Sequence, residues 1–331
     1  MSPSSCSPDT SYLATPQFLS LSMHCASAIE LPIHVFGVYC ILLKTPVKMQ
    51  GVKWTMLVFH LWLAVSDLTI SFLTIPYLVV PSIGGYPLGV LGWLGVPTPV
   101  LVYMNFALVA CTACAVIALF ESRYNIFIAG PSWKNHFRYP FHAFIYTYAL
   151  TFFIPQFIWF VPDQSEALRE FQNFLPCGTS TPANIYFFAG DYRFLSVIFV
   201  SGLIVTVSIC FFFFVSVEKR LWRGTVLSRN TYQLQLRLHY LMIIQTVIPW
   251  IMLFLPIGFF SAAVVISYHN QSLNNFAVLL ISTHGVSSTI VMILIHPPYR
   301  STFISFISLG YKSQGRHHGV SSVKSLCINV K

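Results

Sequence analysis

Charged residues are scarce in this chain. Only 8% of its 331 residues are Asp, Glu, Lys or Arg, and 9 of them are acidic. Soluble domains carry roughly 25% charged residues. With 56% hydrophobic residues and a mean hydropathy of +0.71, a soluble fold would turn many apolar side chains toward water. The composition therefore excludes a soluble globular protein and indicates an integral membrane protein, whose apolar surface faces lipid.

Motifs for catalysis and for metal binding are also missing. The chain contains no zinc-ligand spacing or haem motif, and no HExxH or GxSxG sequence. These patterns mark the common metal sites and hydrolase active sites. Cys111 and Cys114 lie inside an apolar run and are interpreted as small hydrophobic residues. The intramembrane histidines are scattered over different apolar runs and are interpreted as core or interfacial side chains: His60, His142, His239 and His284. We therefore expect no enzyme activity, no metal and no cofactor.

Long apolar runs dominate what is present. A membrane-spanning helix needs about 20 predominantly apolar residues. Seven runs satisfy this requirement, near residues 17–43, 55–80, 97–119, 139–161, 192–216, 239–266 and 276–296. The sequence therefore predicts an all-α membrane protein, a bundle of seven transmembrane helices.

Basic residues set the expected orientation. Of the 18 Lys and Arg residues, 16 lie beside alternate ends of the runs, in the segments that begin at Lys44, Arg123, Lys219 and Arg300. Only Arg169 and Arg193 fall on the other side. Because basic loops stay in the cytoplasm, we expect the N-terminus outside and the C-terminus inside. The same distribution explains the net charge of +9 without a nucleic-acid partner.

This topology divides the chain into three segments. Residues 1–16 are expected to be an extracellular N-terminus, residues 17–296 the seven-transmembrane domain and residues 297–331 a cytoplasmic tail. The first segment has no Lys or Arg and so lacks the basic region of a cleaved signal peptide. The first apolar run is therefore expected to act as a signal anchor.

The beginning of the tail is amphipathic. We expect a short helix on the membrane surface, contacting lipid through Phe303, Phe306, Ile307, Leu309, Arg300 and Lys312. A disordered basic tail is the alternative, and it is favoured beyond Gly315.

The tetrapeptide Glu121-Ser122-Arg123-Tyr124 follows the third run. An acid and an Arg at this membrane edge can form a two-state latch, in which the Arg pairs locally at rest and turns toward a G protein when active. The alternative is an ordinary basic flank that anchors a helix end.

Acidic residues within the apolar runs are candidates for function, because buried ionisable groups are costly in a membrane. Asp67 lies inside the second run, where it could hold sodium or water and link a ligand pocket to the cytoplasmic side; a structural hydrogen bond is the alternative. Glu30 and His34 are four residues apart on one face of the first run. They are expected to pair with each other as a packing contact.

Prolines interrupt several runs and predict kinks. Pro249-Trp250 in the sixth run is a candidate hinge for an outward swing of the cytoplasmic half of that helix. A static kink is the alternative interpretation.

Two kinds of modification are expected outside the membrane. Cys6 and Cys177 are the cysteines of the exterior segments, where the oxidising medium favours a disulfide. Asn270-Gln271-Ser272 is a glycosylation sequon in the third outer loop, and its closeness to the membrane argues against occupancy.

Several blocks resemble the nematode serpentine chemoreceptors of class H. They are Ser11-Tyr12-Leu13-Ala14-Thr15-Pro16, Pro32-Ile33-His34, Tyr39-Cys40-Ile41, Lys44-Thr45-Pro46, Val52-Lys53-Trp54, Gly85-Tyr86-Pro87-Leu88-Gly89, Phe120-Glu121-Ser122-Arg123 and His296-Pro297-Pro298-Tyr299-Arg300. The resemblance runs from about Ser11 to Arg300. The Lys-Thr-Pro block and the last block are the most specific.

The resemblance implies a rhodopsin-like receptor in the plasma membrane of sensory-neuron cilia. Its implied partners are a small environmental molecule, a heterotrimeric G protein and membrane lipids. Relative to rhodopsin-type receptors, the Arg of Glu121-Ser122-Arg123 is shifted by one position, and His296-Pro297-Pro298-Tyr299 stands where Asn-Pro-x-x-Tyr is usual. The top of the third run lacks a cysteine, which favours Cys6 as the partner of Cys177.

A ligand is expected between the third, fifth, sixth and seventh runs. Depth and residue type select Tyr103, Asn105, Phe106, Gln245 and Trp250 as candidate lining residues, and the aromatic and aliphatic surroundings suggest a small, fairly apolar ligand. The rival interpretations are a seven-span transporter or channel and a receptor-shaped scaffold that has lost signalling. The few intramembrane ionisable residues argue against a polar transport path.

Overall fold

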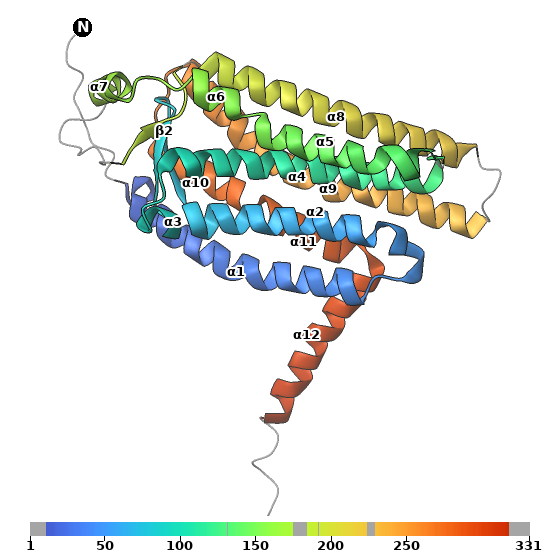
Figure 1. Ribbon diagram of the computed structural model, residues 1–331. Helices are drawn as coiled ribbons and strands as arrows, with labels where there is room; N and C mark the ends of the chain where they lie inside the picture. Colours follow the sequence, from blue (N-terminus) through green and yellow to red (C-terminus); the bar gives the residue numbers. More distant parts are fainter. Residues whose placement is uncertain (1–10, 131, 175–183, 191, 224–228, 318–331) are drawn as a thin grey trace, which may run out of the picture.

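The computed structural model describes residues 11–130, 132–174, 184–190, 192–223 and 229–317. Long helices lie alongside one another in a single bundle (Figure 1). They are α1 (Pro16–Leu43), α2 (Gln50–Leu68), α4 (Thr98–Phe127), α5 (Arg138–Thr151), α8 (Tyr192–Trp222) and α9 (Arg229–Val265), together with the shorter α10 (Gln271–Ser282) and α11 (His284–Ile295).

Six helical segments are long and apolar enough to cross a membrane, and the pair α10 and α11, bent by 44°, makes a seventh if it is one span. One of the six joins α5 to the short helix α6 (Ile154–Trp159). The predicted number of spans is thus reached only when the bent pair counts once. Near its bend, the chain holds the polar sequence Ser282-Thr283-His284.

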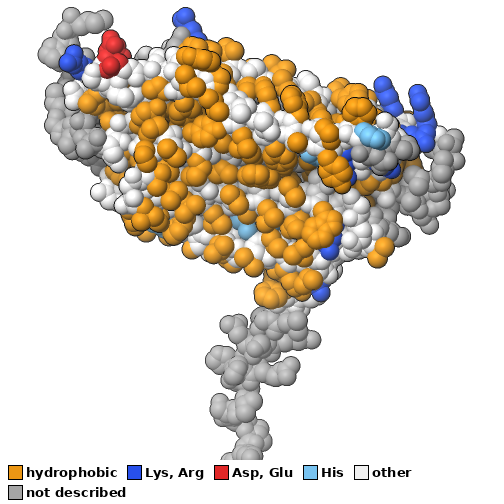
Figure 2. Space-filling model, viewed as in Figure 1, with side chains coloured by type: hydrophobic (Ala, Val, Ile, Leu, Met, Phe, Trp, Pro, Cys, Tyr) orange, Lys and Arg blue, Asp and Glu red, His pale blue; other side chains and the backbone are white. Residues whose placement is uncertain are grey.

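The surface of the bundle is apolar along its middle. Large side chains such as Ile29, Phe211 and Leu255 are more than half exposed, which suits contact with lipid chains. Figure 2 shows hydrophobic side chains over the middle of the bundle, and most of the visible Lys and Arg near the end where α8 finishes and α9 begins. We call this the basic end, and the opposite one the N-terminal end.

A small sheet lies at the N-terminal end. Strands β1 (Pro76–Val79), β2 (Gly84–Pro87) and β3 (Tyr186–Phe187) form it in the order β1-β2-β3, and both pairs are antiparallel. Gln271 and His269 beside α10 contact the carbonyl oxygens of Leu78 (3.0 Å) and Val80 (2.7 Å). The sheet is therefore fastened to the bundle. Helix α7 (Gln164–Phe174) lies beside it (Figure 1).

The second apolar run does not continue as a helix to residue 80, as its composition suggested. The segment η3 (Thr69–Thr74) extends α2 as a π-helix, and Ile75 then adopts a left-handed conformation with φ of 38°. Pro76 follows and starts β1. Proline has no backbone N–H to donate to a helical turn, so the apolar run divides into a helix and a strand.

The remaining short elements connect the helices. They are η1 (Tyr12–Ala14), η2 (Val47–Met49), α3 (Val90–Trp93) and η4 (Trp133–Phe137). After α11, the helix α12 (Pro297–His317) leaves the basic end at a steep angle to the bundle (Figure 1). Phe303 and Phe306 at its start pack against Phe36 of α1, with ring centroids 5.8 and 5.9 Å apart. The expected short helix after the last span is present and is longer than predicted.

Candidate functional site

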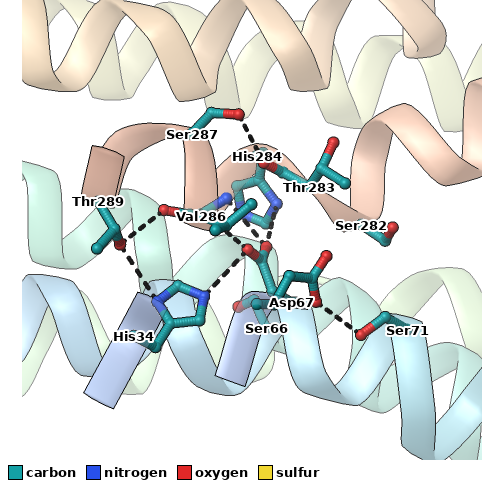
Figure 3. Close-up of polar contacts among 12 residues, drawn as sticks. His34, Ser66, Asp67, Ser71, Ser282, Thr283, His284, Val286, Ser287 and Thr289 are labelled. Atoms are coloured by element: carbon teal, nitrogen blue, oxygen red, sulfur yellow. Dashed lines mark hydrogen bonds and ion pairs between the residues drawn. The ribbon is translucent and has the colours of Figure 1, made fainter. Parts of the chain in front are cut away.

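Asp67 of α2 faces the break between α10 and α11 (Figure 3). Its carboxylate accepts hydrogen bonds from the backbone N–H groups of Gly285 (3.0 Å) and Val286 (2.6 Å). The first N–H groups of a helix have no partner within the helix, and they carry partial positive charge. Asp67 therefore caps α11 from a neighbouring span.

Two imidazole rings complete the surroundings of this carboxylate. Nδ1 of His284 lies 2.9 Å from Oδ1 of Asp67, and Nε2 of His34 lies 3.3 Å from Oδ2. Asp67 and His284 are fully buried, and His34 is 3% exposed. A buried carboxylate is costly unless donors face it, and here four nitrogen donors do so. The site joins α1, α2 and α11.

Thr289 extends the network within the bundle. Its hydroxyl group donates to the carbonyl oxygen of Gly285 (3.0 Å) and lies 3.2 and 3.3 Å from the Nδ1 atoms of His34 and His60. Nε2 of His60 is 3.0 Å from the carbonyl oxygen of His34. These contacts fix the imidazole rings, and with them the donors that face Asp67.

Glu30 lies nearby on α1, but it does not pair with His34 as expected. The hydroxyl group of Ser71 donates to Oε2 of Glu30 at 2.8 Å, whereas His34 contacts Asp67. The prediction of a Glu30–His34 pair was wrong because it considered neighbours on one helix only. Ser71 of η3 and Asp67 of α2 contact these two side chains across the helix interface instead.

A second polar cluster surrounds Glu121 at the basic end. Its carboxylate accepts from the indole N–H of Trp133 (3.0 Å) and contacts Nε of Arg138 (3.2 Å) and Nε2 of His142 (3.2 Å). Glu121 is fully buried. These contacts tie α4 to η4 and α5.

Arg123 points to other partners. One of its terminal nitrogens donates to Oε1 of Gln235 on α9 (3.0 Å), and its Nε contacts the sulfur of Met242 (3.1 Å). Arg123 is 4% exposed. The expected local pairing with Glu121 was wrong, because residues two apart on a helix do not face each other. The acid and the Arg of this motif instead hold α4 to two different neighbours.

Tyr299 closes the basic end near the start of α2. Its hydroxyl group lies 2.7 Å from Oγ1 of Thr45, and its ring packs on His296 with centroids 5.4 Å apart. Tyr299 is fully buried, and this burial raises the pKa of its phenol. Tyr124 lies in a separate aromatic group, against Trp133 and Phe213. Pro297 and Arg300 begin α12.

A cavity of about 340 Å³ lies in the middle of the bundle. Its walls come mainly from α4, α5, α8 and α9, and they are mostly aromatic and aliphatic. His284 of α11 also lines it, and Nε2 of this ring has no hydrogen-bond partner among the described residues. The cavity thus meets the Asp67 network at His284.

Residues 14–309 match the family model of the serpentine type 7TM GPCR chemoreceptor Srh. The chain belongs to this family. It is therefore a multi-pass membrane receptor of the G-protein-coupled type. It is 26% identical over 315 residues to serpentine receptor class H-72 of Caenorhabditis elegans, covering 90% of this chain and 88% of the relative.

The receptor also shares the fold of squid rhodopsin. The crystal structure of that protein matches with a TM-score of 0.58 at 12% identity, covering 96% of this chain and 95% of the other. At this identity the likeness shows the fold alone. It confirms the predicted rhodopsin-like helical bundle.

Of the five residues predicted to contact a ligand in this receptor, Trp250 lines the cavity and four do not. Tyr103 donates to the carbonyl oxygen of Leu150. Asn105 donates to Leu101 (3.0 Å) and Thr74 (3.3 Å). Phe106 contacts Phe153 and Phe199, which do line the cavity, and Gln245 is 2% exposed. Ligand contact by these four stays a prediction.

The other predicted positions have mixed outcomes. Pro249 lines the cavity beside Trp250, and its role as a hinge stays a prediction. Asn270 caps α10 by accepting from the backbone N–H of Leu273 (3.0 Å), and its amide nitrogen lies 3.3 Å from the hydroxyl group of Tyr268. Cys6 and Cys177 lie outside the described residues.

Sequence reasoning missed the role of His284 and Gly285 in the receptor. His284 was interpreted as a core or interfacial histidine. The available signal was the polar run Ser282-Thr283-His284, followed by a glycine, in the middle of an apolar span. A Cβ atom on Gly285 would lie 2.7 Å from Oδ2 of Asp67 and 2.8 Å from the carbonyl oxygen of Leu63. Glycine is what permits this close approach.

Proposed function

We propose that this receptor is chemosensory: it binds small, fairly apolar environmental molecules and then activates a heterotrimeric G protein. Sensory-neuron cilia are the proposed location within the plasma membrane. The name of the nematode relative, a serpentine receptor, agrees with this proposal. The largely apolar cavity supports the ligand class.

The orientation is part of the proposal. The basic end faces the cytoplasm, because Lys and Arg gather there. Residues 1–16 are then extracellular, residues 17–296 form the membrane domain and residues 297–331 form a cytoplasmic tail. The G protein binds at the basic end, where α4, α8 and α9 meet the cytoplasm.

The placement of Arg123 is the observation that carries the proposal. This cation is buried on α4 and held by Gln235 and Met242 of α9. A buried Arg held by neutral partners has little to replace its lost hydration. Movement of α9 away from α4 would expose the guanidinium group to a cytoplasmic partner. In this proposal the contact of Arg123 with α9 is closed in the resting receptor and open in the active one, as a two-state switch requires.

In this proposal, Trp250 and Pro249 couple ligand binding in the cavity to the Arg123 contact. Both line the cavity and lie on α9, the helix that also holds Arg123. Proline removes a backbone hydrogen bond from the helix interior, so α9 can bend at this level. A ligand that prefers the bent form of α9 shifts the population toward it.

The alternative is a seven-span transporter or channel. Such a protein needs a hydrated polar path, and Asp67 and Glu30 instead lie in closed contacts, 0% and 1% exposed. The receptor proposal is therefore preferred. A scaffold without signalling differs from it only in the response of a G protein.

Nucleotide exchange on a purified G protein tests the proposal. The full-length receptor in lipid nanodiscs is expected to accelerate exchange when an active ligand from a small-molecule screen is added. Arg123→Ala is expected to remove most of this acceleration, whereas Arg169→Ala, a change at an exposed basic residue at the N-terminal end, is expected to retain it. Substrate flux or conductance in liposomes, with no exchange, would favour the transporter or channel.

A further inference from the structure

We propose that the cavity binds a small, mainly apolar alcohol whose hydroxyl group hydrogen-bonds to Nε2 of His284. This inference rests on the proposed function, because it names the ligand class of the same receptor. The cavity of about 340 Å³ is at the small end of the range of roughly 300–1,000 Å³ usual for ligand sites. A compact molecule fits it.

The walls determine the body of the ligand. Phe153, Leu203 and Leu253 are typical of the lining, and such side chains offer dispersion contacts but no hydrogen bonds. A molecule with several polar groups would lose its hydration there without replacement. The ligand is therefore apolar over most of its surface.

His284 supplies one polar contact in these walls. The ring is fully buried, and its Nε2 has no hydrogen-bond partner among the described residues. Its Nδ1 lies 2.9 Å from Oδ1 of Asp67 and 2.7 Å from the carbonyl oxygen of Ile281. Both neighbours accept, so Nδ1 carries the hydrogen. Nε2 is left for a group inside the cavity, and leaving it unpaired would be costly.

A hydroxyl group matches this atom in both protonation states of the ring. Nε2 of a neutral ring with hydrogen on Nδ1 accepts a hydrogen bond, whereas Nε2 of the cation donates one. An alcohol can donate or accept, and a ketone or an ether can only accept. An alcohol therefore fits whichever form the buried ring adopts, whereas a ketone or an ether fits only one of them.

The way into the cavity also suits an alcohol that partitions into lipid. The cavity lining includes Phe144, Tyr148 and Val205, side chains of α5 and α8 that are 69%, 45% and 46% exposed. The cavity thus reaches the lipid-facing surface between these helices. At the N-terminal end, the sheet is tied to the bundle through Gln271 and His269. We place ligand entry on the lipid side.

The contact would act directly on the bent span. His284 is the first residue of α11, and its other ring nitrogen lies against Asp67. Asp67 in turn caps α11. A hydroxyl group on Nε2 therefore contacts the residue that begins α11 at the break between α10 and α11.

Photolabelling of the full-length receptor in lipid nanodiscs tests the site without a signalling readout. The probe is an octanol that carries a diazirine, and peptides are mapped after illumination. Labels are expected on lining segments of α4 and α9. Excess 1-octanol is expected to suppress them, and excess octane, which lacks the hydroxyl group, is expected to be several times less effective.

Two variants and one control separate the effect of the hydroxyl contact from the effect of the cavity volume. In His284→Asn, the side-chain amide nitrogen is as many bonds from the backbone as Nδ1 is. The variant therefore keeps a hydrogen-bond donor toward Asp67 but lacks Nε2. It is expected to weaken probe binding threefold to tenfold, about the value of one hydrogen bond. Ala113→Phe fills the cavity, which Ala113 lines, and should abolish the labels. Ala143→Phe, the same change at an exposed position on α5, should leave them unchanged.

The outcomes distinguish this inference from the proposed function. Labels that resist 1-octanol, or that octane suppresses equally, would mean that lipid chains alone fill the cavity, and would overturn the inference whether or not the variants fold. Ligand-driven nucleotide exchange without hydroxyl-dependent labelling would sink the inference and leave the proposed function standing. Hydroxyl-dependent labelling without any nucleotide exchange would contradict the proposed function and support the alcohol site.

Discussion

Asp67 accepts a hydrogen bond of 3.0 Å from the backbone N–H of Gly285, a residue 218 positions later in the chain. The bond connects the middle of the second span to the start of α11, at the bend of 44° in the seventh. The bent span therefore depends on a side chain from another helix for its geometry. This dependence and the contacts at the basic end give five testable predictions.

Asp67→Ala is expected to destabilise the receptor strongly. It leaves two backbone N–H groups and two imidazole rings without their common acceptor, and removing one partner of a buried charged pair costs about 3–5 kcal/mol. Asp67→Asn retains one oxygen and should cost less. Thermal unfolding in one detergent measures both variants. Equal unfolding midpoints for wild type and Asp67→Ala would show that the Asp67 carboxylate does not stabilise the folded receptor.

Gly285→Ala is expected to cost about 1–3 kcal/mol, the usual range for overpacking. The added Cβ would lie 2.7 Å from Oδ2 of Asp67 and 2.8 Å from the backbone oxygen of Leu63. Gly258→Ala on α9 is the matched control, because a Cβ there meets no atom within 4 Å. The two unfolding midpoints are compared directly. If both variants unfold alike, the close approach at Gly285 is not a constraint.

Gln235→Ala is expected to raise nucleotide exchange without ligand several-fold. It removes the acceptor that holds Arg123 against α9, and a hydrogen bond to a charged group is worth about 1.5–3 kcal/mol. Glu121→Gln should not have this effect, because Glu121 contacts Trp133, Arg138 and His142 instead. Basal exchange rates decide between them. If Glu121→Gln raises basal exchange and Gln235→Ala does not, then Glu121 rather than Gln235 controls the switch, which would contradict this prediction.

Tyr299→Phe is expected to lower stability by about 0.5–1.5 kcal/mol, since it removes one hydrogen bond, here to Thr45. Thr45→Val removes the same bond from its other side. The double variant should therefore lose less than the sum of the single changes. Additive losses would show that the two hydroxyl groups do not interact.

The same tyrosine predicts a pH dependence. Burial raises the pKa of Tyr299 above its ordinary value of 10.0, so the folded receptor favours the neutral phenol. This contribution is complete below pH 10 and is lost as the pH rises through the folded-state pKa. The difference in unfolding free energy between wild type and Tyr299→Phe should therefore decrease only in the alkaline range. A difference that is independent of pH would show that the phenol does not titrate with unfolding.

The sequence by itself determined the class and predicted seven apolar spans. Few charges and long apolar runs have one stable solution in lipid, because each helix satisfies its own backbone. The basic residues near Lys44, Arg123 and Lys219 also marked one end of the bundle. These conclusions depend on local composition, so no knowledge of contacts between helices was needed.

Only the tertiary structure decided which polar groups meet. Glu30 and His34 share a helix face, yet Ser71 and Asp67 take them as partners. Glu121 and Arg123 are two positions apart, yet they contact different neighbours of α4. Asp67 stood out in the sequence as an isolated acid, while His284 looked like an ordinary core residue. Their contact joins two spans, and the period of a helix carries no information about which face of another helix it will meet.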